Sequence, residues 1–317
     1  MRKTYWLASY PKSGNTWFRL LVANLRRDAP VDINDIPERS GIASARGSFD
    51  SIMMFPSALL THEECDRLRP MVYAALAEED VEDPDEAETK IGHTRFVKTH
   101  DSYTCNPDGV ALMAGAKGAD GAILIVRDPR DVAPSLANHN RTSIDEAIGF
   151  MADPASSFCG HRDRQPNQLR QQLAGWSGFI DAWLTQTDIP VHLVRYEDMH
   201  ADTGDALRVA LAFAGIDATA EETARAAGFA EFGELKKQEE ERGFREAPRP
   251  KTGKGPGSFF RRGVSGGWRD ELDFGQVARI ERDHAPMMAR LGYALAENAA
   301  AAENGLPTQD RIERMAG

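Results

Sequence analysis

Residues 4–17 read TYWLASYPKSGNTW, and this stretch decides the fold. Its first six residues form a β-rich run, and the apolar run at residues 18–25, FRLLVANL, is helical in pattern. Between them lies the turn Tyr10-Pro11-Lys12-Ser13-Gly14-Asn15-Thr16-Trp17. Such a turn delivers the chain into a helix N-terminus, where backbone N–H groups and the helix dipole favour phosphate. The stretch therefore predicts a phosphate-binding turn between a strand and a helix.

Three further β-rich runs, at residues 94–99, 122–127 and 191–196, have helical patterns between them. This alternation predicts an α/β fold with a mainly parallel central sheet flanked by helices. Two helices are predicted in detail, at residues 167–185 from apolar residues three and four apart, and at residues 206–214, followed by Gly215. No internal repeat and no long linker is present. We predict one domain over residues 1–317, with a helical extension at 271–317.

Composition and charge are those of a globular protein that binds an anion locally. With 41% hydrophobic and 27% charged residues, a chain of 317 residues can bury a substantial core. Of the carboxylates behind the net charge of −11, eight lie in residues 78–88, which we interpret as a solvated helix end and loop. Residues 236–269 instead carry ten Lys and Arg against four Glu. This local excess attracts an anion, and we predict no nucleic-acid partner.

The remaining composition signals concern location, thiols and metals. The N-terminal apolar run is too short for a signal peptide or a membrane span, so we predict a cytoplasmic protein. Cys65, Cys105 and Cys159 are widely spaced without a CxxC pair, which indicates reduced thiols. No HExxH motif or clustered ligand spacing is present, so we predict no bound metal.

Three more segments combine strand ends or basic loops with chemically useful side chains. They read FVKTH at residues 96–100, IVRDPRDVAPS at 125–135 and FRRGVSGGW at 260–268, and two weaker ones read YEDM at 196–199 and EFGELK at 231–236. Their candidate site residues are Lys98, His100, Arg127, Ser135, Tyr196, Phe232, Arg261, Arg262 and Gly263.

Together with the turn, and in this order, the segments resemble the motifs of the PAPS-dependent sulfotransferases of cytosolic type, where PAPS is 3′-phosphoadenosine-5′-phosphosulfate. The resemblance covers about residues 4–270. It implies a P-loop-like three-layer fold, PAPS as the sulfuryl donor, a small-molecule hydroxyl or phenol as the acceptor, and no metal. The sequence departs from the family's motifs at two places: Arg262 stands where the family has lysine, and Ala230 and Glu231 replace small hydroxyl residues.

The resemblance also implies roles for these residues. The turn, including Ser13, Gly14, Asn15 and Thr16, would bind the 5′-phosphosulfate. The 3′-phosphate would be bound by Arg127, Ser135, Arg261, Arg262 and Gly263, and the adenine would stack on Trp17 and Phe232, near Tyr196. Lys12 would neutralise charge on the departing phosphate, and Lys98 would hold the sulfuryl oxygens. His100, with a pKa near 6.5, would remove the acceptor's proton.

From the residues alone, two of these assignments have alternatives. Arg127 would lie at the carboxyl end of a strand, where open α/β sheets bind ligands, but an ion pair with Asp128 or Asp131 is the competing interpretation. Ser135 follows Arg127 by eight residues, with Pro134 between them. We therefore expect the helix there to begin late or to bend near Pro134.

The acceptor side and a possible lid are less defined. Residues 47–56 and 139–161 fill the family's acceptor-side intervals, where Met53, Met54 and Phe55 line a pocket or form a buried helix. Residues 246–257, EAPRPKTGKGPG, form a loop that is either a lid, ordering at Gly253–Gly257 when nucleotide binds, or a plain connection. The oligomeric state stays open.

Two other functions compete. A P-loop small-molecule kinase needs the order GxxxxGK[ST], whereas Lys12 precedes Gly14 here and the turn is shorter. A catalytically silent nucleotide-binding protein would lack the turn lysine or the histidine base, and both are present.

Overall fold

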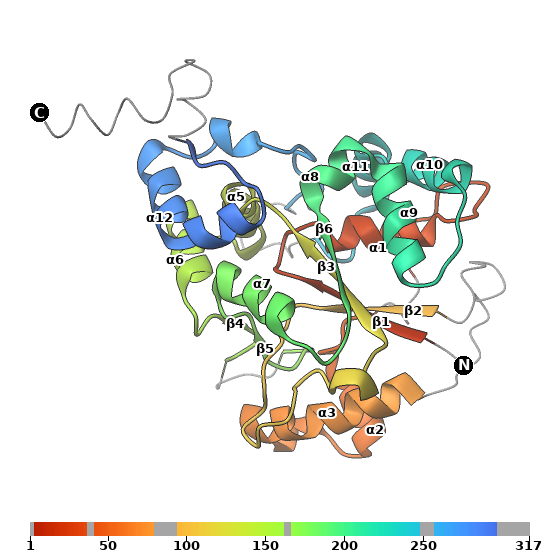
Figure 1. Cartoon of the computed structure of the whole chain (residues 1–317), viewed down its shortest axis with the longest axis vertical. Coiled ribbons are helices and arrows are strands. Elements are labelled where there is room, and N and C mark those ends of the chain that lie inside the picture. The colour runs from red at the N-terminus through yellow and green to blue at the C-terminus, as the bar shows by residue number, and fades with distance from the viewer. Residues whose placement is uncertain (1–2, 37–40, 79–93, 162–165, 248–256, 297–317) are drawn as a thin grey trace, which may run out of the picture.

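The computed structural model describes residues 3–36, 41–78, 94–161, 166–247 and 257–296 (Figure 1). A central sheet contains β1 (Lys3–Ser9), β2 (Thr94–Thr99), β3 (Gly121–Val126) and β6 (Val191–Arg195) in the order β2-β1-β3-β6. Every neighbouring pair is parallel. The predicted strands are confirmed to within one residue at each end, and the first strand lies inside the sheet, between the two strands that carry the other motifs.

Side chains of the central strands alternate between two cores, as the period of two in a strand requires. Trp6 and Ala8 of β1 face one core, and Tyr5 and Leu7 face the other. All six residues of β3 are buried, because helices cover both faces of the sheet. The fold is therefore the predicted three-layer, P-loop-like α/β fold.

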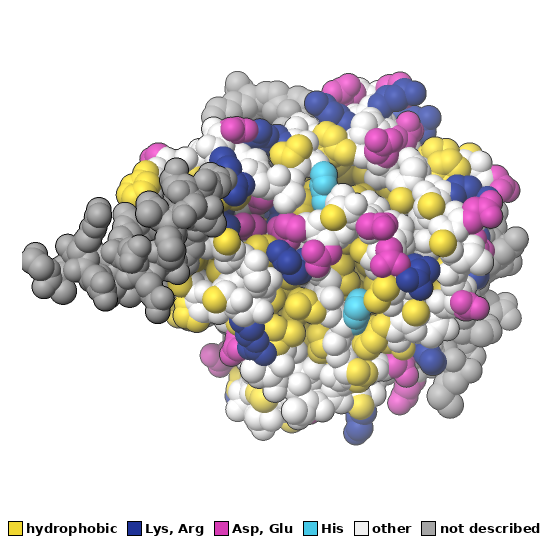
Figure 2. Space-filling model, turned by 45° about the horizontal axis from the view of Figure 1, so that its top comes forward, with side chains coloured by type: hydrophobic (Ala, Val, Ile, Leu, Met, Phe, Trp, Pro, Cys, Tyr) yellow, Lys and Arg dark blue, Asp and Glu magenta, His cyan; other side chains and the backbone are white. Residues whose placement is uncertain are grey.

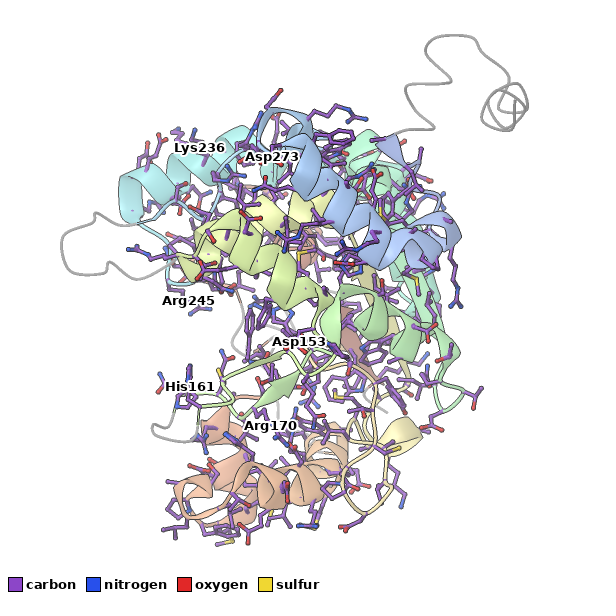
Figure 3. All side chains as sticks on the ribbon, turned by 90° about the vertical axis from the view of Figure 1, so that its left-hand side faces the viewer. Asp153, His161, Arg170, Lys236, Arg245 and Asp273 are labelled. Atoms are coloured by element: carbon purple, nitrogen blue, oxygen red, sulfur yellow. The ribbon has the colours of Figure 1, made fainter. Side chains whose placement is uncertain are left out.

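The helices divide between these two cores (Figure 1). Those in the core with Trp6 are α2 (Arg46–Met53), α3 (His62–Glu78), α5 (Pro129–Asn140), α6 (Ile144–Ala152), α7 (Gly175–Thr185) and α12 (Phe274–Arg290). Those in the core with Leu7 are α1 (Asn15–Ala23), α8 (Tyr196–Ala201), α9 (Thr203–Phe213), α10 (Ala220–Phe229) and α11 (Phe232–Arg242). Short elements complete the described chain: η2 (Ser57–Leu59), η3 (Gly115–Lys117), η4 (Gly267–Asp270) and the antiparallel pair β4 (Ser157–Phe158) and β5 (Gln171–Gln172). Figure 3 shows the segment with Arg170 below α5 and α6, and Lys236 of α11 at the top.

The helix predicted at residues 167–185 is wrong in its first half. Leu169 and Leu173 are buried as expected, but they flank β5, which pairs with β4. Left-handed backbone at Ala174 and Gly175, with φ of 58° and 69°, separates this strand from α7. The apolar spacing reflects burial on both sides of that break rather than one continuous helix.

The late start expected near Pro134 is also wrong. Helix α5 begins at Pro129, because the Asp128 side chain accepts a hydrogen bond from Arg130 N at 2.9 Å and proline suits the first helical position. The helix runs on through Pro134. The second predicted helix is confirmed as α9, and Gly215 beyond it has a φ of 77°.

Several predictions concern peripheral segments. Residues 79–88 and 248–256, which include most of the acidic stretch and of the possible lid, lie outside the described residues. Residues 47–53 belong to α2, with Phe49 buried and Met54 90% exposed just after it, so Met54 does not line a pocket. Helix α12 packs Ile280 and Met288 into the core. None of the described helices has the length and apolarity to cross a membrane.

Candidate functional site

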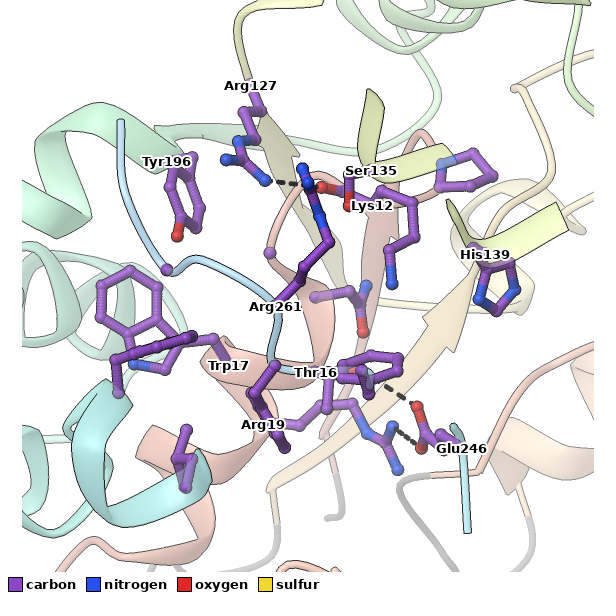
Figure 4. Close-up of a pocket in the computed structure, with 18 of the residues that line it drawn as sticks. Lys12, Thr16, Trp17, Arg19, Arg127, Ser135, His139, Tyr196, Glu246 and Arg261 are labelled. Atoms are coloured by element: carbon purple, nitrogen blue, oxygen red, sulfur yellow. Dashed lines mark hydrogen bonds and ion pairs between the residues drawn. The ribbon is translucent and has the colours of Figure 1, made fainter. Parts of the chain in front are cut away.

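One cavity of about 910 Å³ lies at the carboxyl ends of β1, β2 and β3 (Figure 4). All the predicted site residues line it except Ser13, which is buried beneath the turn. Segments far apart in the sequence thus converge on one site. Acidic and basic side chains are interspersed on the face shown in Figure 2. The charges that line the cavity therefore affect an anionic ligand more than the net charge of the protein does.

The turn presents an open helix N-terminus to this cavity. Helix α1 begins at Asn15, and its N-cap residue, Gly14, has no side chain with which to cap it. Lys12 and Gly14 adopt left-handed backbone with φ of 71° and 108°. A Cβ on Gly14 would lie 2.8 Å from the Tyr196 ring, so only glycine fits between them. The Asn15 amide donates to Leu7 O at 2.9 Å, which ties the turn to β1. Uncapped N–H groups in this arrangement suit an anion.

Two buried polar groups also fit an anionic ligand. Ser13 Oγ and Arg127 Nε are buried and have no hydrogen-bond partner in the described structure. An unsatisfied buried donor costs roughly 1–3 kcal/mol, which a ligand or water must offset.

Arg127 extends from the end of β3 into the cavity. Its guanidinium lies 4.2 Å from the centre of the Tyr196 ring and donates to Val264 O at 3.0 Å. The competing ion pair is not formed within the described residues: Asp128 pairs with Arg130 at 2.7 Å, and Asp131 accepts from the backbone of residues 266 and 268. The charge of Arg127 has no acidic partner there.

Unlike Arg127, Arg261 and Arg262 each pair with an acidic side chain. Arg261 Nη2 donates to Glu271 at 2.8 Å, and Arg262 Nη2 donates to Asp270 at 2.7 Å. The excess of positive charge expected at residues 236–269 is therefore partly neutralised by Asp270 and Glu271. These two acids directly follow the range of residues over which the charge was counted.

Aromatic rings line the end of the cavity next to α1 and α11. Trp17 meets Tyr196 edge-on at 5.4 Å and donates its indole N–H to Ala230 O at 3.0 Å. A Cβ on Gly263 would lie only 2.0 Å from the Phe232 ring, so this glycine, with φ of 62°, is required for their close approach. Flat apolar faces of this kind suit a purine.

His100 is held at the end of β2 in one tautomer. Its Nδ1–H donates to Ser9 O at 2.7 Å, so Nε2 is left as the basic nitrogen. Desolvation, reinforced by the nearby charge of Lys98, lowers the pKa of His100 to about 3. The value near 6.5 assumed from the sequence is thus too high for the free protein, where the imidazole is neutral even in weak acid.

The pKa values of the two lysines, Lys12 and Lys98, are also lowered. Desolvation, followed by repulsion from Lys98 and Arg127, lowers the pKa of Lys12 to about 7. The Lys12 ammonium lies 3.9 Å from the centre of the Phe259 ring. Desolvation also lowers the pKa of Lys98, although Glu246 opposes the shift. Crowded cations of this kind bind an anion favourably, because it restores their protonated forms.

Several charged or polar lining residues had no role assigned from the sequence, among them Arg19, His139 and Glu246. His139 and Glu246 lie at the first positions of the predicted acceptor interval 139–161 and of the possible lid 246–257. Arg19 lies three residues after Thr16, on the same face of α1, and His139 lies four residues after Ser135 on α5, so helical spacing contained both signals. Glu246 contained no such signal, since it lies in a Pro- and Gly-rich loop. The structure brings its carboxylate to Arg19 Nη1 at 2.7 Å and to Thr16 Oγ1 at 3.0 Å (Figure 4).

The other walls are mixed. Ile42, Phe158, Gln168 and Gln171 also line the cavity, and Ile42 forms a β-bridge with Lys98. Phe158 lies within the predicted acceptor interval 139–161, whereas residues 47–56 do not reach the cavity. Within the described residues, no group of three or more His, Cys, Asp or Glu side chains is arranged to hold a metal ion.

Known structures and families agree with this architecture. Among solved structures, mouse sulfotransferase SULT7A1 complexed with PAP is similar with a TM-score of 0.54 and 18% identity, over 95% of this chain and 90% of that chain. A retinol dehydratase in a complex with retinol and PAP is similar with a TM-score of 0.50 and 19% identity, over 91% and 82%. These likenesses show the fold. A comparison with curated proteins gives no match.

The family assignment comes from the sequence itself. The family model described as "Sulfotransferase domain" matches residues 2–292. That range covers the turn, the three strand ends, the basic segment at 260–268 and α12, the elements that either form the cavity or pack behind it. The chain therefore belongs to the sulfotransferase family.

Proposed function

We propose that this sulfotransferase takes the sulfuryl group from PAPS and transfers it to a hydroxyl or phenol of a small molecule. The observation that carries the proposal is the convergence in one cavity of an open helix N-terminus, an arginine with no acidic partner among the described residues, and a histidine with a basic Nε2. The solved structures named above are complexes with PAP, which supports the choice of donor.

The residues divide by position. The turn from Lys12 to Trp17 would bind the 5′-phosphosulfate, and Arg127 with Ser135 would bind the 3′-phosphate. Arg261 and Arg262 would join this second group by exchanging their carboxylate partners for the phosphate. Trp17 and Phe232 would enclose the adenine.

Bound PAPS supplies the sulfuryl group. His100 Nε2 accepts the proton of the acceptor hydroxyl as its oxygen bonds to sulfur, and the electron pair of the broken S–O bond remains on the 5′-phosphate. Lys12 stabilises that oxygen, a contribution typically worth about 2.7–4 kcal/mol for one preorganised donor. Lys98 orients the sulfuryl oxygens. No step requires a metal, and a single domain in the cytoplasm stays the prediction from the sequence.

Two measurements test the proposal. First, 3′,5′-phosphoadenosine should raise the melting temperature more than ADP or ATP with Mg²⁺, because only it offers the 3′-phosphate. Equal stabilisation by ATP with Mg²⁺ would favour a P-loop kinase. Second, mass spectrometry of a panel of phenols and alcohols incubated with PAPS should detect sulfated product. Binding of 3′,5′-phosphoadenosine with no product from any acceptor would instead favour the catalytically silent nucleotide-binding protein.

A further inference from the structure

Glu246 is an acid in the part of the cavity that contains Lys98 and Arg19. One carboxylate oxygen, Oε1, accepts from Arg19 Nη1 at 2.7 Å. The other, Oε2, accepts from Thr16 Oγ1 at 3.0 Å and lies 3.5 Å from Lys98 Nζ (Figure 4). Three donors from α1 and β2 thus surround one carboxylate, as they would surround a bound sulfate or phosphate oxygen.

Two of these donors are the ones that the donor molecule needs. A hydroxyl has a single proton to donate, so Thr16 Oγ1 cannot serve Glu246 and a phosphosulfate oxygen at once. Lys98 has three N–H donors, but its ammonium lies 3.5 Å from Oε2, so the carboxylate offsets part of the positive charge that would otherwise attract the phosphosulfate. Glu246 therefore competes with an incoming anion for part of the site.

The carboxylate is charged whenever the protein is folded near neutral pH. Desolvation would raise the pKa of Glu246, but the charges of Lys98 and Arg19 outweigh it and lower the pKa to about 2. A negatively charged donor would meet a like charge beside Thr16, which opposes binding.

The two oxygens of Glu246 differ in how firmly they are held. Arg19 is only 6% exposed, and Glu246 is the acid with which it pairs at 2.7 Å. The backbone on either side is fixed, since Arg245 N donates to Asn34 Oδ1 at 2.9 Å and Ala247 N donates to Phe244 O at 3.0 Å. The contacts of Oε2 are longer, at 3.0 Å to Thr16 Oγ1 and 3.5 Å to Lys98 Nζ, and both of these groups line the cavity. The side chain can therefore turn about its bond to Arg19 without moving the loop.

We propose that Glu246 is an internal counter-anion of the donor site. In the free protein it occupies the subsite formed by Thr16, Arg19 and Lys98, and on donor binding it releases Thr16 and Lys98 to the phosphosulfate while keeping Arg19. The inference rests on the proposed function. It makes Glu246 a residue that weakens donor binding and keeps the buried arginine paired.

Titration calorimetry with PAPS, in the absence of acceptor, tests this role. In Glu246→Gln the amide oxygen still accepts from Arg19, while an NH2 group faces Thr16 and Lys98 and no longer competes for their protons. We expect this variant to bind PAPS about three- to tenfold more tightly than the wild type, because the competent arrangement no longer has to be reached by displacing a charge. The matched control is Glu240→Gln on the exposed face of α11, which removes the same charge and should change the affinity less than about twofold.

Each outcome has one meaning. Equal or weaker binding of PAPS by folded Glu246→Gln overturns the inference and makes Glu246 a structural acid. No binding of PAPS by the wild type overturns the proposed function instead. If Glu246→Gln does not fold, Glu246→Asp replaces it, since a side chain one methylene shorter cannot contact Arg19 and Thr16 together and should also tighten PAPS binding. Unchanged or weaker binding by that variant overturns the inference in the same way.

Discussion

Two groups of charged side chains meet at the end of β2, and they are built on opposite principles. In the first, Arg69 of α3 is fully buried and each side of its guanidinium has a partner. It donates to Asp101 at 2.5 Å, to Asp66 at 3.3 Å and to the Tyr73 hydroxyl at 2.8 Å. The nearby carboxylates keep the pKa of Arg69 well above its ordinary value, despite desolvation.

The second group begins one residue away, at His100, and lacks this balance. Lys98 and Arg19 share the carboxylate of Glu246, Lys12 lies over the Phe259 ring, and Arg127 stacks on a tyrosine ring without an acidic partner in the described structure. Here desolvation lowers the pKa of both lysines. A balanced cluster holds the fold together, whereas a cluster with excess positive charge is completed by a ligand.

Replacing His100 tests whether the second cluster has the proposed catalytic function. If His100 Nε2 accepts the proton of the acceptor, His100→Ala should lower turnover with an alcohol by about 10²- to 10⁴-fold and leave the affinity for 3′,5′-phosphoadenosine nearly unchanged. Steady-state kinetics and calorimetry measure the two quantities. An ionised phenol, which needs no base, provides the internal control. Full activity of the variant on an alcohol at neutral pH would make His100 a structural residue.

Replacing Arg69 should disrupt the first cluster and thereby destabilise the fold. Arg69→Met leaves two buried carboxylates without their shared cation, so we expect the free energy of unfolding to fall by about 3–5 kcal/mol. Urea denaturation measures the loss. Arg67, two residues earlier in the same helix and half-exposed in its pair with Asp108, provides the control, since Arg67→Met should cost less than about 1 kcal/mol. Equal losses from the two variants would contradict the contrast between the clusters.

Proton uptake on ligand binding is a further test of the contrast between the two clusters, because only the second contains a lysine with a lowered pKa. Because the pKa of Lys12 lies at about 7 in the free protein and 10.5 is its ordinary value, the lysine loses its proton as the pH rises through 7. A bound anion raises that pKa again, so binding should take up about half a proton at pH 7, rising toward one at pH 8.

The affinity for 3′,5′-phosphoadenosine should accordingly fall as the pH rises above 7. Calorimetry in buffers of different ionisation enthalpy measures the uptake, and Lys12→Met should abolish it. Uptake that persists in this variant would assign the proton to another group.

A smaller effect comes from His284, a neutral group buried in α12. Desolvation lowers its pKa to about 4, and its Nδ1 lies 2.8 Å from Ser177 Oγ. The folded pKa is below the unfolded value of 6.5, so its contribution to stability is complete above pH 6.5 and is lost as the pH falls toward 4. One such group gives a loss of about 1 kcal/mol between pH 7 and 5.5. His284→Gln should flatten the measured slope by that amount, and an unchanged slope would exclude His284.

The sheet and the motifs could be predicted because their signals are local. A β-rich run predicts a strand, and motifs at the carboxyl ends of several strands predict that the site lies at that edge of the sheet. The pairing partners of Arg261 and Arg262 were missed because Asp270 and Glu271 lie just past the motif. Glu246 could not be predicted, since its position beside Thr16 depends on a fold across 230 residues of sequence. The pKa of His100 depends likewise on desolvation, which no sequence pattern expresses.

The position of β1 inside the sheet has a consequence for synthesis on the ribosome. Its first neighbour, β2, begins at Thr94, so about 85 residues must be translated after Ser9 before the two strands can pair. At 5–20 residues per second this takes roughly 4 to 17 s, during which an apolar strand destined for full burial is exposed. We therefore expect β1 to stay unpaired through this interval, and the cavity cannot close until residues 260–268 have been translated.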